Sequence, residues 1–251
     1  MVILGRRIPM MASLVLWALA WEAVGRLELT FLLPPFTGVL AALVEIAPTD
    51  SFARATVSTL TSFSLGMALA VAVGVPLGIL MGRVRAADRL LGMWVNLFVS
   101  APLSALVPVL MILFGMDETT VVMSVFLFAV WIIALDTRAG VRHVTPSLIE
   151  MARSYGAGRT ALYGKIILLA ALPEILAGIR IGLIRGVKGV VIGQLLVAII
   201  GYGELFELYS RNFLMEEFWA LTSLLFAFAM IVSEGVGAIE KRLEYYAGAR
   251  E

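Results

Sequence analysis

The sequence predicts an all-α membrane protein with about six transmembrane helices. Of its 251 residues, 61% are hydrophobic and only 15% are charged, and the mean hydropathy is +0.99. A water-soluble domain of this length carries more charge and fewer apolar residues. Irregular backbone cannot face lipid, so long apolar stretches in such a chain must be helical. No soluble segment stands out, and we expect one transmembrane domain over residues 1–251.

Six apolar stretches come close to the roughly 20 residues that a helix needs to cross a bilayer. They lie at about residues 8–27, 56–82, 92–115, 119–137, 176–200 and 217–239. Gly74, Pro76 and Gly78 interrupt the second stretch, and Pro102 and Pro108 interrupt the third. We expect kinks at the prolines, and close helix packing through the small residues.

The distribution of basic residues predicts the orientation. If the N-terminus is cytoplasmic, the inner segments hold thirteen basic residues and the outer segments hold three. The inner set is Arg6, Arg7, Arg83, Arg85, Arg89, Arg138, Arg142, Arg153, Arg159, Lys165, Lys241, Arg242 and Arg250. The outer set is Arg26, Arg54 and Arg211. Because cytoplasmic loops carry the excess of Lys and Arg, both termini should be cytoplasmic.

Two connecting segments are expected to form helices of their own. On the outer side, Pro35 begins an amphipathic helix over about residues 35–46, with Leu40, Leu43 and Val44 on its apolar face. On the inner side, residues 138–175 form the longest cytoplasmic segment, in which EMARSYGAGRTALYGK is charged and broken by glycines.

Inside that inner segment, the pattern predicts two helices separated by a glycine turn. Leu148, Ala152 and Tyr155 give the first helix an apolar edge. Gly156 and Gly158 end this helix, and Thr160 can cap the second one. A short amphipathic helix suits a lipid surface as well as a groove in another protein, so the pattern alone leaves both open.

Several separated motifs resemble one protein family. The stretch EMARSYGAG, followed by AALPEILAGIRIGL, resembles the EAA loop of permease subunits in binding-protein-dependent ABC importers. Glu150, Ala152, Gly156 and Ile166 fall on the family spacing, and Met151 replaces the usual middle alanine. GVPLGILMG and LVPVLMILFG are also typical, and the likeness runs from LLPPFTGVLAAL to IEKRLEYY. More narrowly, the chain is similar to the sulfonate, taurine, nitrate and bicarbonate permease group.

The resemblance implies a type I ABC importer permease-like bundle in the bacterial cytoplasmic (inner) membrane. A second permease copy would complete the substrate pathway, two cytoplasmic ATPase subunits would bind below, and an extracytoplasmic substrate-binding protein would deliver the cargo. The chain has no GxxxxGK[ST] phosphate loop. ATP and Mg²⁺ would therefore be bound by the partner ATPase, and this chain would be a transport subunit without a cofactor, not an enzyme.

The resemblance also implies which residues contact the ATPase. They are the consecutive residues Glu150, Met151, Ala152, Arg153, Ser154, Tyr155, Gly156 and Ala157. This helix would sit in a groove of the ATPase and convert closure of the nucleotide sites into rigid-body movement of the bundle. Glycine at position 156 would permit close approach and a positive φ.

The fifth apolar stretch contains cations that point to a substrate pathway. From Arg180, near the inner edge, Arg185 and Lys188 lie deeper by roughly 7 and 12 Å. A charge at the centre of a membrane helix costs about 2.5–3.5 kcal/mol, so such residues are functional candidates. Gln194 stands where the family often has a glutamate. We hypothesise that Arg185 or Lys188, with Gln194 nearby, lines the pathway and favours an anionic cargo such as a sulfonate, taurine, nitrate, bicarbonate or carboxylate.

An alternative reading gives the same cations a structural role. Arg185 and Lys188 could pair with Asp136 in the fourth stretch or Glu234 in the sixth and hold the bundle together, since buried charges are usually paired. A neutral heterocycle is the alternative cargo. An ion-coupled secondary carrier is a further alternative, but it would need inverted repeats or discontinuous helices, which the sequence does not reveal.

Composition excludes other classes of protein. The chain has no cysteine and one histidine, which excludes thiolate and multi-histidine metal sites. The apolar stretches contain no cluster of acids, histidines or nucleophiles, as a membrane-embedded enzyme would need. A net charge of +1 gives no reason to expect nucleic acid as a partner, and membrane lipid is the expected surrounding.

Overall fold

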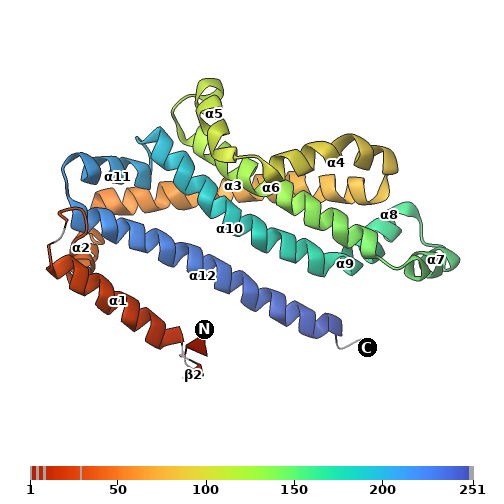
Figure 1. Cartoon of the computed structure of the whole chain (residues 1–251). Helices are drawn as coiled ribbons and strands as arrows, with labels where there is room; N and C mark the ends of the chain where they lie inside the picture. The colour runs from red at the N-terminus through yellow and green to blue at the C-terminus, as the bar shows by residue number, and fades with distance from the viewer. Residues whose placement is uncertain (1, 4–5, 8–9, 29, 249–251) are drawn as a thin grey trace.

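Three helices pack together at the centre of the fold: α3 (Asp50–Arg83), α6 (Glu118–His143) and α10 (Leu172–Val197). The computed structural model describes residues 2–3, 6–7, 10–28 and 30–248 (Figure 1). Near the N-terminus, β1 (Val2–Ile3) and β2 (Arg6–Arg7) form a short antiparallel pair. Everything else regular in the described part is helical, as the sequence predicted. Arg250 lies outside the described residues.

Capping explains where two of the central helices begin. The hydroxyl of Thr49 accepts the N–H of Phe52 at the start of α3, with an oxygen–nitrogen distance of 3.3 Å. The carboxylate of Asp117 accepts the N–H of Thr119 at the start of α6, at 2.8 Å. Each side chain satisfies one of the N–H groups that a helix leaves free in its first turn.

Eight glycines bring α3 and α10 close to α6, and we call this contact the glycine seam. Its members are Gly66, Gly74, Gly78 and Gly82 on α3 and Gly178, Gly182, Gly189 and Gly193 on α10. A methyl group added at Gly78 would lie 2.5 Å from the Cβ of Thr137, and one at Gly189 would lie 2.9 Å from the Cα of Val125. Small residues therefore let the helices approach closely, as expected for Gly74 and Gly78.

Two spans are broken. The first runs through α4 (Arg85–Ser100), a 3₁₀ turn η1 (Leu103–Leu106) and α5 (Val107–Phe114), and its halves bend by 99°. Pro102 stands at this break and has no N–H for the carbonyl of Phe98, so the helix cannot continue. The sequence predicted a kink at this position. It did not reveal a discontinuous helix, and the structure contains one here.

The second break precedes α10. Four short elements lead into it: α7 (Pro146–Ser154), α8 (Arg159–Ala161), a π-helical turn η2 (Leu162–Ile167) and α9 (Leu168–Ala170). The helix over residues 159–170 bends by 63° from α10, which has Pro173 in its first turn. Proline fits the first turn because the N–H that it lacks would have no partner there.

Length and composition identify the helices of the described part that can cross a membrane. Among the described residues, three helices can cross a membrane by length and composition, or five if each bent pair counts as one span. The three are α3, α6 and the part Met215–Val232 of α12 (Met215–Gly248). The first predicted stretch gives α1 (Met10–Arg26), whose 17 residues reach about 26 Å against a hydrocarbon core of about 30 Å.

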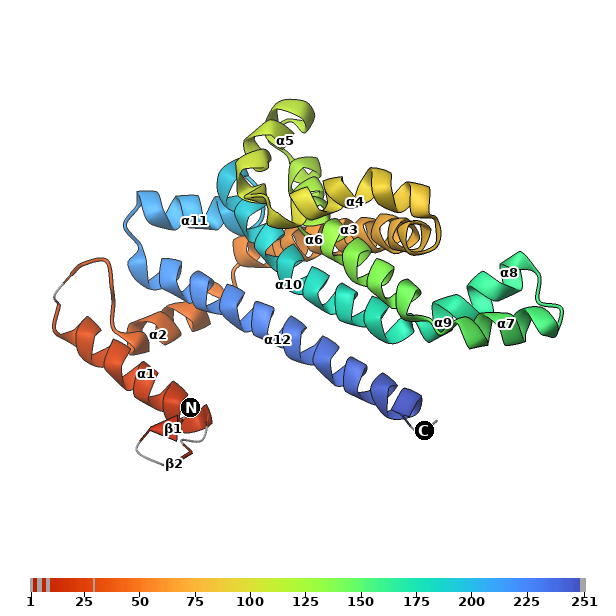
Figure 2. The same ribbon diagram turned by 45° about the vertical axis from the view of Figure 1, so that its right-hand side comes forward.

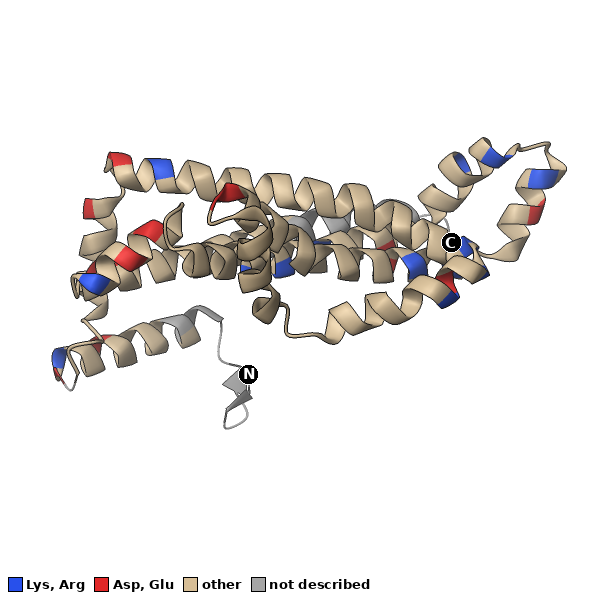
Figure 3. Ribbon diagram, turned by 90° about the horizontal axis from the view of Figure 1, so that it is seen from above, with Lys and Arg blue, Asp and Glu red and all other residues tan. Residues whose placement is uncertain are grey.

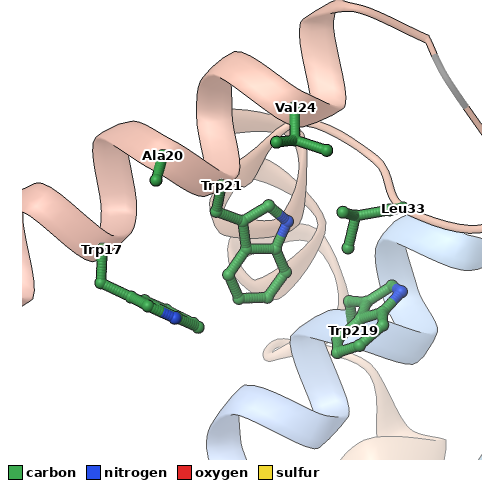
Figure 4. Close-up of a pocket in the computed structure, with 6 residues that line it drawn as sticks. All are labelled: Trp17, Ala20, Trp21, Val24, Leu33 and Trp219. Carbon is green, nitrogen blue, oxygen red and sulfur yellow. The ribbon is translucent and has the colours of Figure 1, made fainter.

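The end of the molecule that holds α2 (Phe36–Ile46) and α11 (Tyr202–Arg211) also joins α1 to α12 (Figures 1 and 2). Trp21 stands between Trp17 and Trp219 with edge-to-face ring centroids at 4.9 and 5.3 Å. These rings border a cavity of about 290 Å³ (Figure 4). The indole N–H of Trp21 donates to the carbonyl of Pro34, and that of Trp219 donates to Leu32, so the aromatic contacts also hold the loop before α2.

The packed face of α2 differs from the predicted one. Its buried side chains are Val39, Ala42 and Ile46. Leu43 packs partly against the same cluster, whereas Leu40 and Val44 are exposed. The helix is apolar on almost every side, so periodicity could not identify the face that packs against protein and the face left for lipid.

Charges separate along the molecule. Basic residues gather at the end where α7 and α8 project and the C-terminus lies, and acidic residues are more frequent at the opposite end (Figure 3). At the basic end, Asp88 of α4 forms ion pairs with Arg138, at 2.5 Å, and with Arg142, both from α6. These pairs join the first half of the broken span to the central helix.

Candidate coupling segment and substrate pathway

The segment predicted to contact the ATPase projects from one end of the bundle as a helix, a turn and a second helix (Figures 1 and 2). Its first helix, α7, begins at Pro146 and ends at Ser154. Ala152 faces inward and packs with Leu162 and Ile167 of η2. The two halves of the segment therefore share an apolar cluster, which continues into Val141 of α6 and Ile175 of α10.

The turn after α7 is a Schellman cap. Gly156 has φ +77°, its N–H donates to the carbonyl of Arg153, and the N–H of Ala157 donates to the carbonyl of Ala152, both at 2.9 Å. These two bonds satisfy carbonyls that the helix end would leave free, and they require a left-handed residue at position 156. A methyl group at Gly156 would meet no atom of this chain, so conformation and not space selects glycine here.

Three details of the predicted segment are corrected. Gly158 adopts an extended conformation that any residue can take, with φ −69° and ψ 168°. It is also the residue that precedes α8, whereas Thr160 lies inside that helix and caps nothing. The predicted apolar edge is divided, because Ala152 is buried while Tyr155 is 87% exposed. The predictions assumed helical spacing across this stretch, and the Schellman turn interrupts that spacing.

The outer face of α7 carries an exposed apolar stripe. Leu148, Met151 and Tyr155 are spaced by three and four residues and are all exposed, Met151 to 48%. Residues at this spacing lie on one side of a helix. The side chains of Glu150 and Arg153 are exposed too, and within the described part of the chain neither forms an ion pair. Ser154 donates to the carbonyl of Glu150, at 3.0 Å.

Lys188 and Arg185 have different surroundings although both lie on α10. Lys188 is exposed and lines an apolar cavity of about 560 Å³ formed by α10, α11 and α12. Arg185 is half-buried, and its guanidinium donates to the carbonyl of Val99 at the end of α4, at 3.4 Å. Arg185 also attracts the carboxylate of Asp136 electrostatically. Glu234 is exposed on α12, and in the described ranges it forms no ion pair with either cation.

Gln194 is 2% exposed and sits in a polar contact between α3, α10 and the start of α11. Its side-chain oxygen accepts the hydroxyl of Thr59 at 3.0 Å and the N–H of Tyr202 at 3.3 Å. Gly201, at φ +60°, lies directly against its amide nitrogen. Gln194 therefore faces packed protein in this chain, and it lines none of the cavities described above.

The hydroxyl of Tyr202 adds a second link at the same place. It is 2.9 Å from the hydroxyl of Thr56 on α3, and burial raises the pKa of the Tyr202 phenol. The hydroxyl therefore stays protonated and able to donate. The start of α11 is fixed to α3 by two neighbouring polar contacts, one through Tyr202 and one through Gln194.

Sequence reasoning missed the residues that complete these contacts. Asp88, Thr59 and Tyr202 bind partners that are between 50 and 146 residues away in sequence, and no local pattern marks such pairs. The only available signal was an acid among the basic residues of the α3–α4 turn. In the ranges that the structure covers, no three His, Cys, Asp or Glu side chains gather to hold a metal ion.

Comparison with known proteins assigns the chain to a family. Residues 74–245 match the model of the family described as "Binding-protein-dependent transport system inner membrane component". The chain belongs to this family and is a permease subunit of an ABC importer. It is a transport subunit and not an enzyme, as the sequence predicted.

Individual relatives show to which permeases within the family the chain is similar. The chain is 31% identical to the taurine transport system permease protein TauC of Escherichia coli (strain K12), over 91% of this chain and 86% of the relative. It is 29% identical to the putative aliphatic sulfonates transport permease protein SsuC of the same organism, over 84% and 79%. It is 28% identical to the bicarbonate transport system permease protein CmpB of Synechococcus elongatus, over 64% and 59%. The assignment to this permease group is confirmed.

Solved structures show the same fold. A chain of the MetNI methionine ABC transporter in an inward-facing conformation aligns with a TM-score of 0.64 at 21% identity, covering 77% of this chain and 96% of that one. A chain of an amino acid ABC transporter with histidines aligns with a TM-score of 0.57 at 19% identity, covering 80% and 97%. The bundle therefore has the fold of type I ABC importer permeases.

Proposed function

We propose that two copies of this chain form the pathway of an ATP-driven importer for a small anion in a bacterial inner membrane. In this proposal two ATPase subunits bind ATP and Mg²⁺ on the cytoplasmic side, and a substrate-binding protein delivers cargo on the other side. The observation that carries the proposal is the exposed stripe of Leu148, Met151 and Tyr155, held by the Gly156 cap on a projecting helix. An exposed apolar face on so short a helix fits a groove in a partner protein.

The orientation of the proposed complex follows from charge. The basic residues gather at the end that carries α7 and α8 (Figure 3), which supports a cytoplasmic location for that end and for the ATPase contact. Because α7 and η2 share an apolar core, a push on α7 would be transmitted to α9 and α10. This route supports coupling between nucleotide-site closure and movement of the bundle.

The anionic cargo rests on two observations. The named relatives carry taurine, aliphatic sulfonates and bicarbonate, all of which contain an anionic group. Lys188 is an exposed cation near the middle of α10, on the rim of an apolar cavity. A cation in surroundings of low dielectric attracts an anion strongly. Of the three predicted pathway residues, Lys188 is the one that we propose contacts the cargo, because Arg185 and Gln194 already bind protein groups.

The ATPase contact is tested by copurification. We expect Tyr155→Ser combined with Met151→Ser to release the ATPase subunits from the purified complex, because the substitutions remove apolar area from the docking face. Tyr155→Phe keeps that area and should retain the ATPase. If the double substitution still copurifies with full ATPase stoichiometry and transports normally, α7 is not the coupling helix.

The cargo contact is tested by uptake in reconstituted vesicles with the binding protein present. Lys188→Met keeps the length of the side chain and removes the charge, and we expect it to lower the uptake of labelled taurine, an aliphatic sulfonate or bicarbonate at least tenfold. Lys188→Arg should retain most of the uptake. Unchanged anion uptake by Lys188→Met, with the ATPase still bound, would remove Lys188 from the pathway.

A further inference from the structure

The break between α4 and η1 leaves backbone carbonyls without their usual partners. A helix cannot satisfy the carbonyls of its last turn, and here the chain turns by 99° before the next helix begins. Pro102 removes the N–H that would have bonded the carbonyl of Phe98. The carbonyl of Val99 lies in the last turn of α4, at the negative end of the helix dipole.

Arg185 supplies a donor to this helix end. Its guanidinium reaches the Val99 carbonyl from α10, a helix that is 86 residues further along the chain. A cation at a helix C-terminus interacts favourably with the dipole, and a guanidinium offers several N–H groups to free carbonyls. In the described part of the chain this is the one side-chain hydrogen bond found between α10 and α4.

Asp136 places a negative charge near Arg185 from α6, the third helix at this position besides α10 and α4. It lies on α6 against Gly178 of α10, where a methyl group would come within 2.7 Å of the Asp136 Cβ. Arg185 and Asp136 attract each other across the α6–α10 contact, although among described residues they do not approach within ion-pair distance. Gly178 thus leaves room for an acid of α6 near Arg185, the residue of α10 that hydrogen-bonds to α4.

We propose that Arg185 is a positioning residue that holds the broken span in place, with Asp136 as its counter-charge. Through it, α10 and α6 fix the end of α4, from which η1 and α5 turn away. The fixed end sets the direction in which α5 leaves the bundle. We call the contact of Arg185 with the Val99 carbonyl and Asp136 the joint. That the joint is used during import rests on the proposed function, whereas its effect on the position of α4 does not.

The neighbouring cation provides a matched control. Lys188 lies one helical turn from Arg185 on the same helix, but it is exposed and contacts no described backbone carbonyl. Removing either residue takes one positive charge from α10. Only the removal of Arg185 takes away the donor to Val99, so the two substitutions separate a positioning role from a general electrostatic one.

The absence of cysteine allows a direct test of the joint. A nitroxide is attached to Ser100→Cys, an exposed position beside Val99, or to Met93→Cys, an exposed position two turns earlier on α4. The labelled chain is studied in the full complex in lipid nanodiscs, with thiols of the other subunits replaced. We expect Arg185→Gln to shorten the rotational correlation time at position 100 at least twofold and to leave position 93 unchanged. Arg185→Lys should restore most of the restriction, and Lys188→Gln should change neither position.

The contribution of Asp136 is tested in the same assay. Asp136→Asn should loosen position 100 in the same direction but less than Arg185→Gln. The double variant should be no looser than Arg185→Gln alone, because the acid acts through the arginine. Unchanged mobility at position 100 in Arg185→Gln would overturn the proposal, and additive effects in the double variant would remove Asp136 from it.

Transport separates this proposal from the proposed function. We expect Arg185→Gln to lower anion uptake at least fivefold while ATP hydrolysis continues, and Arg185→Lys to retain uptake. If the unmodified complex moves no anion but the mobility change at position 100 is found, the cargo is wrong and the joint stands. If anion uptake is normal in Arg185→Gln and position 100 is unchanged, the joint is wrong and the cargo stands.

Discussion

The glycines of the central bundle and the glycine of the coupling segment have opposite physical roles. In the glycine seam, a methyl group would collide with α6, as at Gly78, where the nearest side-chain carbon would be 2.5 Å away. At Gly156 a methyl group would meet nothing, but the backbone is left-handed with φ +77°. The seam requires glycine because a larger residue would not fit, and position 156 requires glycine because its backbone is left-handed.

The glycine seam and the coupling segment therefore differ in what fixes their structure. The seam makes α3, α6 and α10 one packed unit, whose parts cannot shift without breaking close contacts. The turn of the coupling segment takes its shape from two hydrogen bonds that involve no glycine of the seam, and its apolar residues pack with Val141 of α6 and Ile175 of α10. Substitutions in the two regions should therefore fail in different ways: loss of the folded bundle in one, and loss of partner contact in the other.

The largest effect is expected at the seam. Gly78→Val places a branched side chain against Thr137 and the carbonyl of Ala134, and overpacking of this kind typically costs about 1–3 kcal/mol or more. We expect a lower yield of monodisperse protein and a midpoint of thermal unfolding reduced by several degrees. Gly235→Val on α12 is the matched control, because a side chain there meets open space. Equal stability of the two variants would show that the seam is not tightly packed.

The polar contact at Gln194 should rank second. Gln194→Leu removes the acceptor that the hydroxyl of Thr59 and the N–H of Tyr202 share. The hydroxyl keeps the carbonyl of Ala55 at 2.8 Å and the N–H keeps the Thr59 hydroxyl at 3.3 Å, so we expect the loss of ordinary hydrogen bonds, about 0.5–1.5 kcal/mol each. Thr59→Val removes one partner only and should cost less. In the double variant the loss should be smaller than the sum, since both changes remove the same hydrogen bond. Additive losses, measured by thermal unfolding, would mean that the contact contributes nothing.

Much of the fold was predictable because it depends on local composition. Apolar length predicted the long helices, Pro102 predicted a kink at the first break, and glycine predicted close packing and the turn after α7. The break before α10 was not predicted. The face of a helix that packs against protein was harder to predict. In α2, Leu40 and Val44 look no different from the buried Val39, because lipid and protein core both accept apolar side chains.

The candidate site was predictable only in part, for a related reason. Lys188 and Arg185 were identified as functional candidates by their position in an apolar stretch, but their different roles depend on partners far away in sequence. Val99 reaches Arg185 only because Pro102 breaks the span, and Gln194 turns toward protein only because Tyr202 follows a left-handed Gly201. Such contacts require the three-dimensional fold.

Gly156→Ala should have a smaller effect on stability than either change above. A left-handed conformation costs an L-residue about 1–2 kcal/mol, and the cost falls on the coupling segment alone. We expect faster hydrogen exchange over residues 150–158, weaker retention of the ATPase, and an unchanged unfolding midpoint of the bundle. Gly158→Ala is the control, since that residue is extended and open. If both variants exchange alike, the left-handed cap does not stabilise the segment.

The smallest effect is expected for the ion pairs at the basic end. Asp88→Asn removes the charge from the pairs with Arg138 and Arg142 but keeps the shape of the side chain. Arg142 is 44% exposed, and a pair with an exposed partner contributes about 0–1 kcal/mol. Salt distinguishes this contact from the seam. At about 1 M salt the Debye length falls to about 3 Å, so the difference between Asp88→Asn and the unmodified chain should shrink. The loss caused by Gly78→Val should persist, because steric overlap is not screened. A destabilisation of Asp88→Asn that is independent of salt would instead mean that Asp88 holds α4 by packing, in the same manner as the glycine seam holds α6.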